Sequence, residues 1–369
     1  MAQIEFSEEQ NMLLETASEF CKKNASIDLV RASIDTDDGI NREIWQEIAD
    51  LGWLGIIVPE EFGGLGLGLS DAVPIVESMG RYLMTSPYSA TVMATQAIVS
   101  SANTEQKNRW LPKIVSGTVA TVALTEVDGS WNLDEAECKG EAAGDGYELS
   151  GSKCFVQDLL LAELVVVSVV INDKARLVVL DLSAIPKEKY RREVVIDETR
   201  RSYRLDLDGL IVPEADLLPG TDFKSLEFSA LLMLCAEISG GLVGVLHVIV
   251  EYLNTRKAFD RLIGSYQALK HPTVDILMSL EAARSHLYHA STLLSQGNLK
   301  EFESAIRIAK AQGSEAFAFA GDRAVQFHGG FGFTYECDAQ LFLRRALWCQ
   351  YQFGDERYHR QWLAGALFD

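Results

Sequence analysis

The spacing of hydrophobic residues changes along the chain and separates segments of different character. In the first segment apolar residues recur every three or four positions, as in NREIWQEIADLGWLG and in SEEQNMLLETASEF (7–20), where Ser7 is a typical helix N-cap. The next segment contains short runs rich in Val and Ile, such as ELVVVSVVI (163–171), separated by Gly, Asn and Asp. These patterns predict helices over 1–118 and strands over 119–220.

Helical periodicity returns after residue 222 and is then sustained over long stretches. The order of helices, strands and helices predicts a mainly α protein with a central β domain. The expected parts are an N-terminal α-helical domain (1–118), a middle β domain (119–220) and a C-terminal helical bundle (221–369). The helices of the last part are expected at 224–255, 266–296, 299–328, 338–352 and 356–367.

Composition and charge narrow the range of partners. The 369-residue chain has a net charge of -20, which argues against nucleic acids and anionic membrane surfaces, because both attract basic patches. No apolar run is expected to reach the length that spans a membrane, and the start MAQIEFSEEQ is too acidic and polar for a signal peptide. Six cysteines without a CxxC pair predict free thiols and a cytoplasmic location. His286 and His289 lack a ligand partner at suitable spacing, so no metal site is expected.

Two motifs of the C-terminal segment combine cations, aromatic rings and glycines. In RKAFDRLIGSYQ (256–267), Arg256 either ends a helix or clamps a pyrophosphate, with Phe259 as a ring against it or against a nearby base. In QFHGGFGF (326–333), the paired glycines either cap a helix or let a ligand approach the main chain. There Gln326 offers its amide to an adenine or a ribose.

Two motifs of the strand-rich segment offer hydrogen-bonding groups. ALTEVDGSW follows a predicted strand, and its Thr125 and Ser130 bond either a cofactor or the turn itself. GSKCFVQD (151–158) is interpreted first as a hairpin strand with Phe155 in the core. Taken one at a time, these motifs leave both interpretations open.

The order and spacing of the motifs resemble those of the acyl-CoA dehydrogenase family over essentially the whole chain. The stretches that carry the resemblance are LGWLGIIVPEEFGGLG, TEQKNRWLPKIVSGT, VALTE, GSK, RKAFDRLIG and QFHGGFGFTYE. The resemblance implies a helical domain, a middle β-barrel and a four-helix bundle, with FAD as the cofactor and an acyl-CoA as the substrate. In this family a proton leaves Cα and a hydride leaves Cβ of the thioester, and the electrons pass to an electron-transfer flavoprotein.

The resemblance also implies an FAD site shared by two subunits. The β domain of one subunit holds the flavin ring, and Thr125 and Phe155 are the candidates for that role here. The bundle of the neighbouring subunit holds the pyrophosphate and the adenine. The residues implied for this second half are Arg256, Phe259, Gln267, Gln326, Gly329 and Gly330, and all of them match the family pattern.

The carboxylate base is missing from both positions where the family places it. The reaction needs a positioned base with a tuned pKa, because the Cα proton of a thioester is only weakly acidic. Most members carry a glutamate in a YEG stretch, and the matching residue here, counted from Arg344, is Phe353 in YQFGD. Other members carry it on the first bundle helix, where the matching position is about Ala230.

The flavin-ring half departs from the family pattern as well. The family's TEPGxGSD is here TEVDGSW, and its WIT is here FVQ, with Gln157 in place of the threonine. The bundle half is therefore intact, while the ring half and the base are not. This contrast predicts the non-catalytic subunit of an α2β2 heterotetramer, like those of the steroid-type acyl-CoA dehydrogenases, with a homologous subunit as its partner. A bulky or steroid side-chain acyl-CoA is expected by the same analogy.

Two alternatives stay open at the level of the sequence. A displaced carboxylate, either Glu237 in LCAEISGG or Asp355 with its neighbour Glu356, makes the chain a self-sufficient homo-oligomeric dehydrogenase. Against this alternative, Glu237 is expected in a hydrogen bond between helices, and Asp355 and Glu356 are expected to cap the last helix. The other alternative is a non-redox acyl-CoA-binding or hydratase-like member of the fold.

Overall fold

The computed structural model describes the backbone of residues 7–368 and the side chains of residues 7–366, and it contains two compact units. The helical unit comprises the described residues up to 32, 70–84 and 231 onward, and the β-containing unit comprises 33–69 and 85–230. The division into three domains at 118 and 220 stays a prediction.

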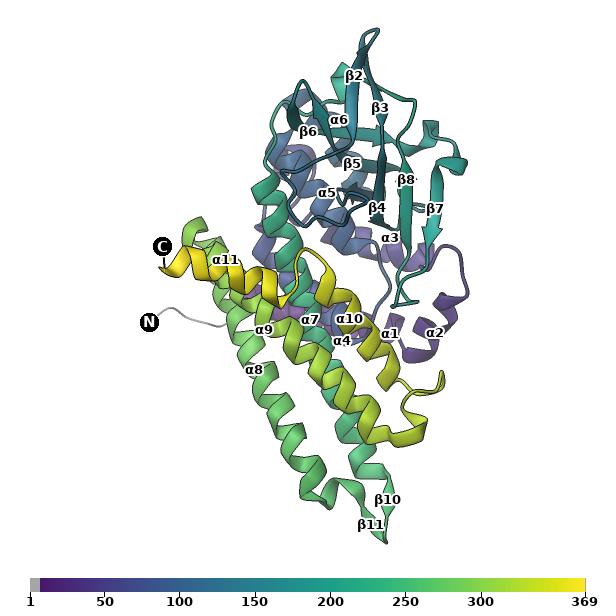
Figure 1. Cartoon of the computed structure of the whole chain (residues 1–369), viewed down its shortest axis with the longest axis vertical. Coiled ribbons are helices and arrows are strands. Elements are labelled where there is room, and N and C mark those ends of the chain that lie inside the picture. Colours follow the sequence, from purple (N-terminus) through teal and green to yellow (C-terminus); the bar gives the residue numbers. More distant parts are fainter. Residues whose placement is uncertain (1–6, 369) are drawn as a thin grey trace. The chain divides into compact units, whose positions relative to one another are not determined.

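The helical unit is built from long helices that pack along their lengths (Figure 1). Helix α9 packs against α8, α10 and α11, and α1 packs against α4. The helices are α1 (Glu8–Asn24), α2 (Ile27–Ile34), α4 (Val73–Arg81), α7 (Phe223–Thr255), α8 (Gln267–Ser295), α9 (Leu299–His328), α10 (Ala339–Tyr351) and α11 (Glu356–Phe368). Each of the five C-terminal helices begins and ends within one residue of its predicted limits, because periodicity over so many turns leaves little choice.

Local signals start these helices where the sequence predicts. The N-cap Ser7 and Gln10 form a reciprocal capping box, in which each side chain accepts a hydrogen bond from the other residue's backbone N–H at 3.2 Å. The side chain of Asn298 likewise accepts a hydrogen bond from the backbone N–H of Glu301 and starts α9. The prediction that Ser7 is an N-cap is confirmed.

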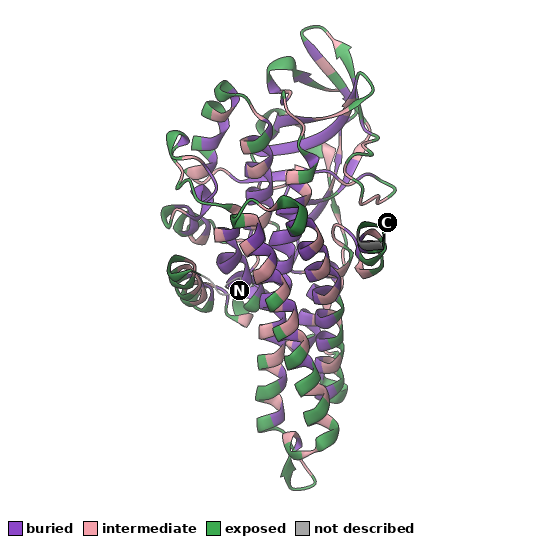
Figure 2. Cartoon of the chain, turned by 90° about the vertical axis from the view of Figure 1, so that its left-hand side faces the viewer, coloured by how far each residue is buried: buried purple, intermediate pink, exposed green. Residues whose placement is uncertain are grey.

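Helix α7 corrects one expectation from the sequence. It is long and apolar enough to cross a membrane by length and composition, so the expectation that no apolar run has this length is wrong. However, 72% of its most apolar window is buried within the protein. Figure 2 shows buried residues along the facing sides of the bundle helices, with exposed residues toward the tip of the bundle. The apolar character of α7 is therefore that of a core helix.

The β-containing unit has two sheets and supporting helices. The larger sheet has the strand order β1-β5-β2-β3-β9, with β6 paired to β5, and the smaller sheet has the order β4-β8-β7. Helix α5 (Tyr88–Ser101) packs against β1, and Thr91 Oγ1 donates a hydrogen bond to the carbonyl of Ala120 at 2.9 Å. The strands are β1 (Ala120–Ala123), β2 (Lys139–Ala143), β3 (Gly146–Ser150), β4 (Ser152–Gln157), β5 (Leu164–Ile171), β6 (Lys174–Asp181), β7 (Tyr190–Glu193), β8 (Ser202–Asp206) and β9 (Leu210–Pro213). Two further helices of the unit are α3 (Arg42–Asp50) and α6 (Thr104–Val115).

The sequence located the β segment but not all of its strands. In the stretch YELSGSKCFV the chain turns at Gly151, which has φ +108°, so β3 lies in the larger sheet and β4 in the smaller one. Strands β2, β8 and β9 were not predicted: β2 and β8 lack Val and Ile, and β9 is a run of only four residues, LIVP, that ends in proline. All six cysteines are free and buried, so the prediction of free thiols is confirmed.

A small hairpin between α7 and α8 was also missed. It consists of β10 (Lys257–Ala258) and β11 (Arg261–Leu262), which pair antiparallel at the tip of the bundle (Figure 1). Both turn residues, Phe259 and Asp260, have positive φ, at +53° and +59°. A two-residue turn of this kind is normally Asn-Gly or Asp-Gly, so the Phe-Asp pair gave no turn signal in the sequence.

Candidate functional site

The six residues predicted to hold the FAD dinucleotide lie at helix ends or in the hairpin of the helical unit. All are exposed: Arg256 directly after α7, Phe259 in the hairpin turn, Gln267 at the start of α8, Gln326 in the last turn of α9, and Gly329 and Gly330 just beyond α9. We call these six residues the bundle-end site.

Side-chain stacking brings the two chain segments of the bundle-end site together. The rings of Tyr252 on α7 and His328 on α9 stack with centroids 3.9 Å apart and an interplanar angle of 23°. Arg256 follows Tyr252 by about one helical turn, and Gly329 follows His328 directly. The C-terminal ends of α7 and α9 therefore lie next to each other, as a shared dinucleotide site requires.

Arg256 of the bundle-end site and two neighbouring cations are available to a ligand. Among the described residues, neither Arg256 nor its neighbours Lys257 and Arg261 takes part in an ion pair. Three unpaired cations within six positions stand out in a chain whose net charge is -20. A guanidinium presents a planar fork of donors that matches phosphate oxygens, so Arg256 is suited to a diphosphate.

The glycines of the bundle-end site leave the backbone open. A β-carbon at Gly329 or Gly330 would have no neighbouring heavy atom within 4 Å, whereas one at Gly332 would lie 2.2 Å from the carbonyl oxygen of Val325. Gly329 also has φ +61° and ψ -141°, a conformation restricted to glycine. Gly332 thus serves packing, while the space beside Gly329 and Gly330 is free for a ligand to touch the main chain.

Exposed aromatic residues surround these glycines and the hairpin. Phe259 is 92% exposed although its backbone is in the left-handed region, where a bulky residue is strained by about 1–3 kcal/mol. Phe333 and Tyr335 are 75% and 59% exposed, and Phe331 is 44% exposed. Large aromatic side chains left in water at one end of a bundle are typical of a surface that another molecule covers.

The two flavin-ring candidates meet in the β-containing unit. Thr125 forms an antiparallel bridge with Cys154, whose backbone N–H donates to the Thr125 carbonyl at 2.9 Å. Phe155 follows with φ +54° and is 42% exposed, so the expectation that it belongs to the core is wrong. Its backbone N–H donates to the Glu193 carboxylate at 2.9 Å, which places an acid beside the aromatic residue.

The loop after Thr125 does not suit a diphosphate. Residues 127–137 (VDGSWNLDEAE) contain four acidic residues and no Lys or Arg. Ser130 is engaged in the local turn: its N–H donates to Asp128 at 2.9 Å, and its hydroxyl accepts from the backbone N–H of Asn132 at 3.3 Å. The loop therefore repels phosphate groups at the position where the sequence left a cofactor bond open.

A buried ion pair closes this loop and was not predicted. Lys153 Nζ donates to Glu126 Oε1 and, at 2.8 Å, to Ser168 Oγ. Glu126 Oε1 also accepts the backbone N–H of Glu137 at 2.8 Å, so the loop's two ends are tied together. Burial, together with the nearby Glu126, raises the pKa of the Cys138 thiol to about 12, despite the opposing charge of Lys153. The partners are too far apart in the sequence for a motif to reveal them.

The two positions at which the resemblance predicts the base carry apolar side chains here. Ala230 on α7 is 2% exposed, and Phe353 is half-buried in the turn between α10 and α11. Phe353 and Gly354 both have positive φ, at +54° and +103°. A β-carbon at Gly354 would lie 2.5 Å from the Tyr358 ring, so this glycine is required by packing.

The buried side chains of Lys310 and His359 fix the Phe353–Gly354 turn through its backbone carbonyls. Lys310 Nζ donates to the carbonyl of Gly354 at 2.7 Å, and His359 Nε2 lies 3.0 Å from the carbonyl of Phe353. Burial, with the charges of Lys310 and Arg307, lowers the pKa of His359 to about 3, so the ring is neutral and donates from Nε2. Burial likewise lowers the pKa of Lys310 to about 8. The turn is therefore fixed, but the side chain that it presents has no acid–base chemistry.

The alternative carboxylates are engaged in structural contacts. Glu237 Oε1 accepts a hydrogen bond from Arg345 Nη1 at 2.6 Å, in a buried ion pair that joins α7 to α10. Asp355 Oδ1 accepts the backbone N–H of Tyr358 at 2.8 Å at the start of α11. Glu356 accepts a hydrogen bond from Gln350 at 3.1 Å. The contacts of Glu237 and Asp355 are the ones that their structural interpretation predicts, whereas Glu356 bonds a side chain of α10 and does not cap α11 through this contact.

Metal ligands do not gather among the described residues. No group of three or more His, Cys, Asp or Glu side chains in that part of the chain could hold a metal ion. Burial, with His289 nearby, lowers the pKa of His286. The absence of a metal site stays a prediction for the protein as a whole.

Comparison with known proteins gives one consistent family. The family models described as acyl-CoA dehydrogenase, N-terminal domain, and acyl-CoA dehydrogenase, C-terminal domain, match residues 7–118 and 226–368. Acyl-CoA dehydrogenase FadE12 of Mycobacterium tuberculosis is 30% identical over 313 residues, which are 80% of this chain and 79% of that protein. Acyl-CoA dehydrogenase IpdE2 of Mycolicibacterium smegmatis is 28% identical over 341 residues, 92% of this chain and 93% of that protein. A solved structure of a variant of the Tcur3481-Tcur3483 steroid ACAD is 27% identical, covers 97% of each chain and has a TM-score of 0.87.

Proposed function

The chain belongs to the acyl-CoA dehydrogenase family, whose members are FAD-dependent flavoproteins, and we propose that it is the non-catalytic subunit of a heteromeric dehydrogenase. In this proposal its bundle-end site holds the diphosphate and adenine part of an FAD whose ring lies in a homologous partner subunit. The partner also supplies the base. The observation that carries the proposal is the contrast between an open, cationic bundle-end site and a base position occupied by Phe353.

The bundle-end site has the chemistry that this role requires. Arg256 would hold the diphosphate through its guanidinium, and the backbone beside Gly329 and Gly330 would lie against the dinucleotide. Gln267 and Gln326 would supply amide groups, and Phe259 an apolar ring. When bound, FAD supplies an acceptor for the hydride that leaves Cβ of the acyl thioester.

The missing base explains why a partner is needed. Removal of the Cα proton requires a carboxylate in contact with that carbon, and apolar residues fill both family positions. Glu237 is held by Arg345, and Asp355 caps α11, so neither is free to move a proton. The acidic loop 127–137 further disfavours a diphosphate in this chain's own β-containing unit.

The substrate and the electron acceptor of the complex are proposed by analogy with relatives of this chain. The Tcur3481-Tcur3483 relative is described as a steroid ACAD, which supports a bulky or steroid side-chain acyl-CoA as the substrate of the complex. In the proposal, α,β-desaturation takes place in the partner's half of an α2β2 assembly in the cytoplasm. The electrons then pass to an electron-transfer flavoprotein.

Substitution of Arg256 tests the proposal. The chain is co-expressed with its homologous partner subunit and the complex is purified. Arg256→Ala removes the guanidinium that would bind the diphosphate, so FAD affinity of the complex is expected to fall about tenfold or more. FAD content and its dissociation constant are measured by flavin absorbance and fluorescence after gel filtration. Arg360→Ala is the matched control, since Arg360 is an exposed arginine of the same unit that pairs with Glu315. Full FAD retention in Arg256→Ala contradicts the proposal.

The colour of the purified chain separates the alternatives. A chain that is yellow by itself and is bleached by an acyl-CoA is a self-sufficient dehydrogenase, which contradicts the proposal. A chain that stays colourless both alone and with its partner contradicts it as well, and supports a non-redox member of the fold. The proposal predicts a colourless chain alone and a yellow complex.

A further inference from the structure

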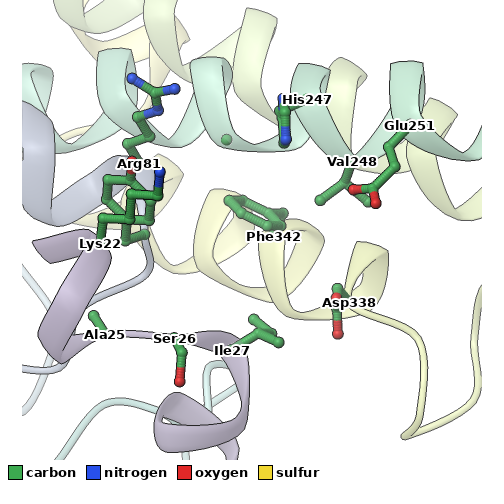
Figure 3. Close-up of a pocket in the computed structure, with 12 residues that line it drawn as sticks. Lys22, Ala25, Ser26, Ile27, Arg81, His247, Val248, Glu251, Asp338 and Phe342 are labelled. Atoms are coloured by element: carbon green, nitrogen blue, oxygen red, sulfur yellow. The ribbon is translucent and has the colours of Figure 1, made fainter. Parts of the chain in front are cut away.

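A cavity of about 380 Å³ opens in the helical unit, and none of the residues that line it belongs to the bundle-end site (Figure 3). Its lining comes from the junction of α1 and α2, the end of α4, the middle of α7 and the start of α10. Phe342, which is 4% exposed, and Val248 provide apolar surface inside it. The volume lies within the range of about 300–1,000 Å³ that small-molecule sites occupy.

The charged side chains of this cavity separate by sign. Figure 3 shows Lys22 on one side and Glu251 and Asp338 on the other, with Phe342 between them, whereas the guanidinium of Arg81 points away from Phe342. Asp338 is paired with Arg31 at 2.6 Å. Among the described residues, no hydrogen bond or ion pair engages the side chain of Lys22 or that of Glu251. One unpaired cation and one unpaired carboxylate thus face a shared apolar surface.

The helices place the acidic end at a distance from the contact between α4 and α7. The Arg81 carbonyl oxygen lies 2.3 Å from the position of a β-carbon on Gly244, which marks that contact. Glu251 follows Gly244 by seven residues of α7, which corresponds to about 10 Å along the helix. Asp338 precedes Phe342 by about one turn of α10, in agreement with an acidic end displaced along the cavity.

We propose that this cavity binds a small zwitterion with an extended apolar body, such as an ω-amino acid. Its carboxylate lies toward Lys22, its ammonium group toward Glu251, and its methylene chain over Phe342. A simple anion would meet the unpaired carboxylate of Glu251, and a simple cation would meet Lys22, so only a molecule with both charges satisfies the two ends. This binding is separate from the proposed FAD role, and neither depends on the other.

A matched ligand series tests the proposal on the full chain. Binding of glycine, 4-aminobutanoate, 6-aminohexanoate, hexanoate and hexylamine is measured by isothermal titration calorimetry at low salt. Affinity is expected to rise from glycine to 6-aminohexanoate, because only the longer molecule reaches both ends. Hexanoate and hexylamine, which each lack one charge, are expected to bind about tenfold more weakly than 6-aminohexanoate. No saturable binding by any amino acid of the series overturns the proposal, and so does equal binding of hexanoate.

Two substitutions then assign the ends of the ligand. Lys22→Gln and Glu251→Gln are each expected to weaken 6-aminohexanoate binding about tenfold. Lys23→Gln, at the next residue of α1 and outside the cavity lining, is the control and should leave binding unchanged. Tighter binding of hexanoate and 6-aminohexanoate by Glu251→Gln would identify a site for simple anions and overturn the zwitterion proposal. Thermal melts of each variant separate a lost site from a lost fold.

Discussion

At the scale of single residues, the turn at which the base is predicted is held by buried side chains but carries no acid. Lys310 and His359 hold the carbonyls of Gly354 and Phe353, so the turn is as fixed as a base position needs to be. The residue that it presents is nevertheless a phenylalanine. The sequence showed the missing glutamate but not the support, because a lone Lys and a lone His on separate helices are indistinguishable from surface residues.

The titration of His359 is expected to make the free energy of unfolding depend on pH in the acid range. The folded-state pKa of about 3 lies below the ordinary value of 6.5, so the unfolded chain binds the proton more tightly. The contribution of the neutral ring is complete above pH 6.5 and is lost as the pH falls toward 3, on the order of 2 kcal/mol by pH 5. Urea unfolding between pH 7 and pH 4 measures the slope. In His359→Gln, which keeps an N–H donor but does not titrate, the slope should flatten, and an unchanged slope contradicts this assignment.

Glu237 provides a second test at this scale. Because Glu237→Gln leaves the charge of Arg345 buried without its carboxylate, the free energy of unfolding is expected to fall by about 3 kcal/mol. Replacing both residues, by Leu and Met, should recover most of that loss, since an apolar pair needs no compensation. Chemical denaturation measures both. A Glu237→Gln variant of normal stability that has lost dehydrogenase activity would show instead that Glu237 is the base.

At the scale of elements, the long helices were predictable and the short strands were not. The bundle helices repeat their pattern over many turns, whereas β2, β8 and β9 are four or five residues long and owe their position to neighbouring strands. The hairpin at Phe259 lacks the usual turn residues, so the sequence did not indicate that a turn leaves this side chain exposed to solvent. The motif residues of the bundle-end site were identified from the sequence, but the Tyr252–His328 stack that brings their two helices together was not.

Two glycines in the segment that follows α9 allow the effect of a substitution on FAD binding to be distinguished from its effect on stability. Gly330→Ala places its methyl group in open space, so the melting temperature should stay unchanged while FAD affinity of the complex falls several-fold. Gly332→Ala is the contrast: its methyl group would overlap the Val325 carbonyl, and the fold itself should lose stability. Differential scanning fluorimetry and flavin content report the two effects. Unchanged FAD content in Gly330→Ala would mean that the backbone there does not touch the cofactor.

At the scale of the whole molecule, one unit carries charges that disfavour the phosphate groups of FAD, and the other carries charges that favour them. The chain is strongly acidic, and its β-containing unit carries an acidic loop where the flavin half-site is expected. The helical unit keeps unpaired cations at the tip of its bundle. Such a chain is suited to bind the diphosphate and adenine half of FAD in its helical unit and is poorly suited to bind the flavin-ring half in its β-containing unit.

Flavin stoichiometry of the native complex tests this account most directly. The complex is purified with its partner, and FAD is released and counted against each subunit by absorbance and quantitative amino-acid analysis. Because each complete site needs one bundle-end site of this chain and one ring half of the partner, the account predicts one FAD for each pair of unlike subunits. Two FAD molecules per pair, or a full complement of FAD in an oligomer of this chain alone, would contradict it.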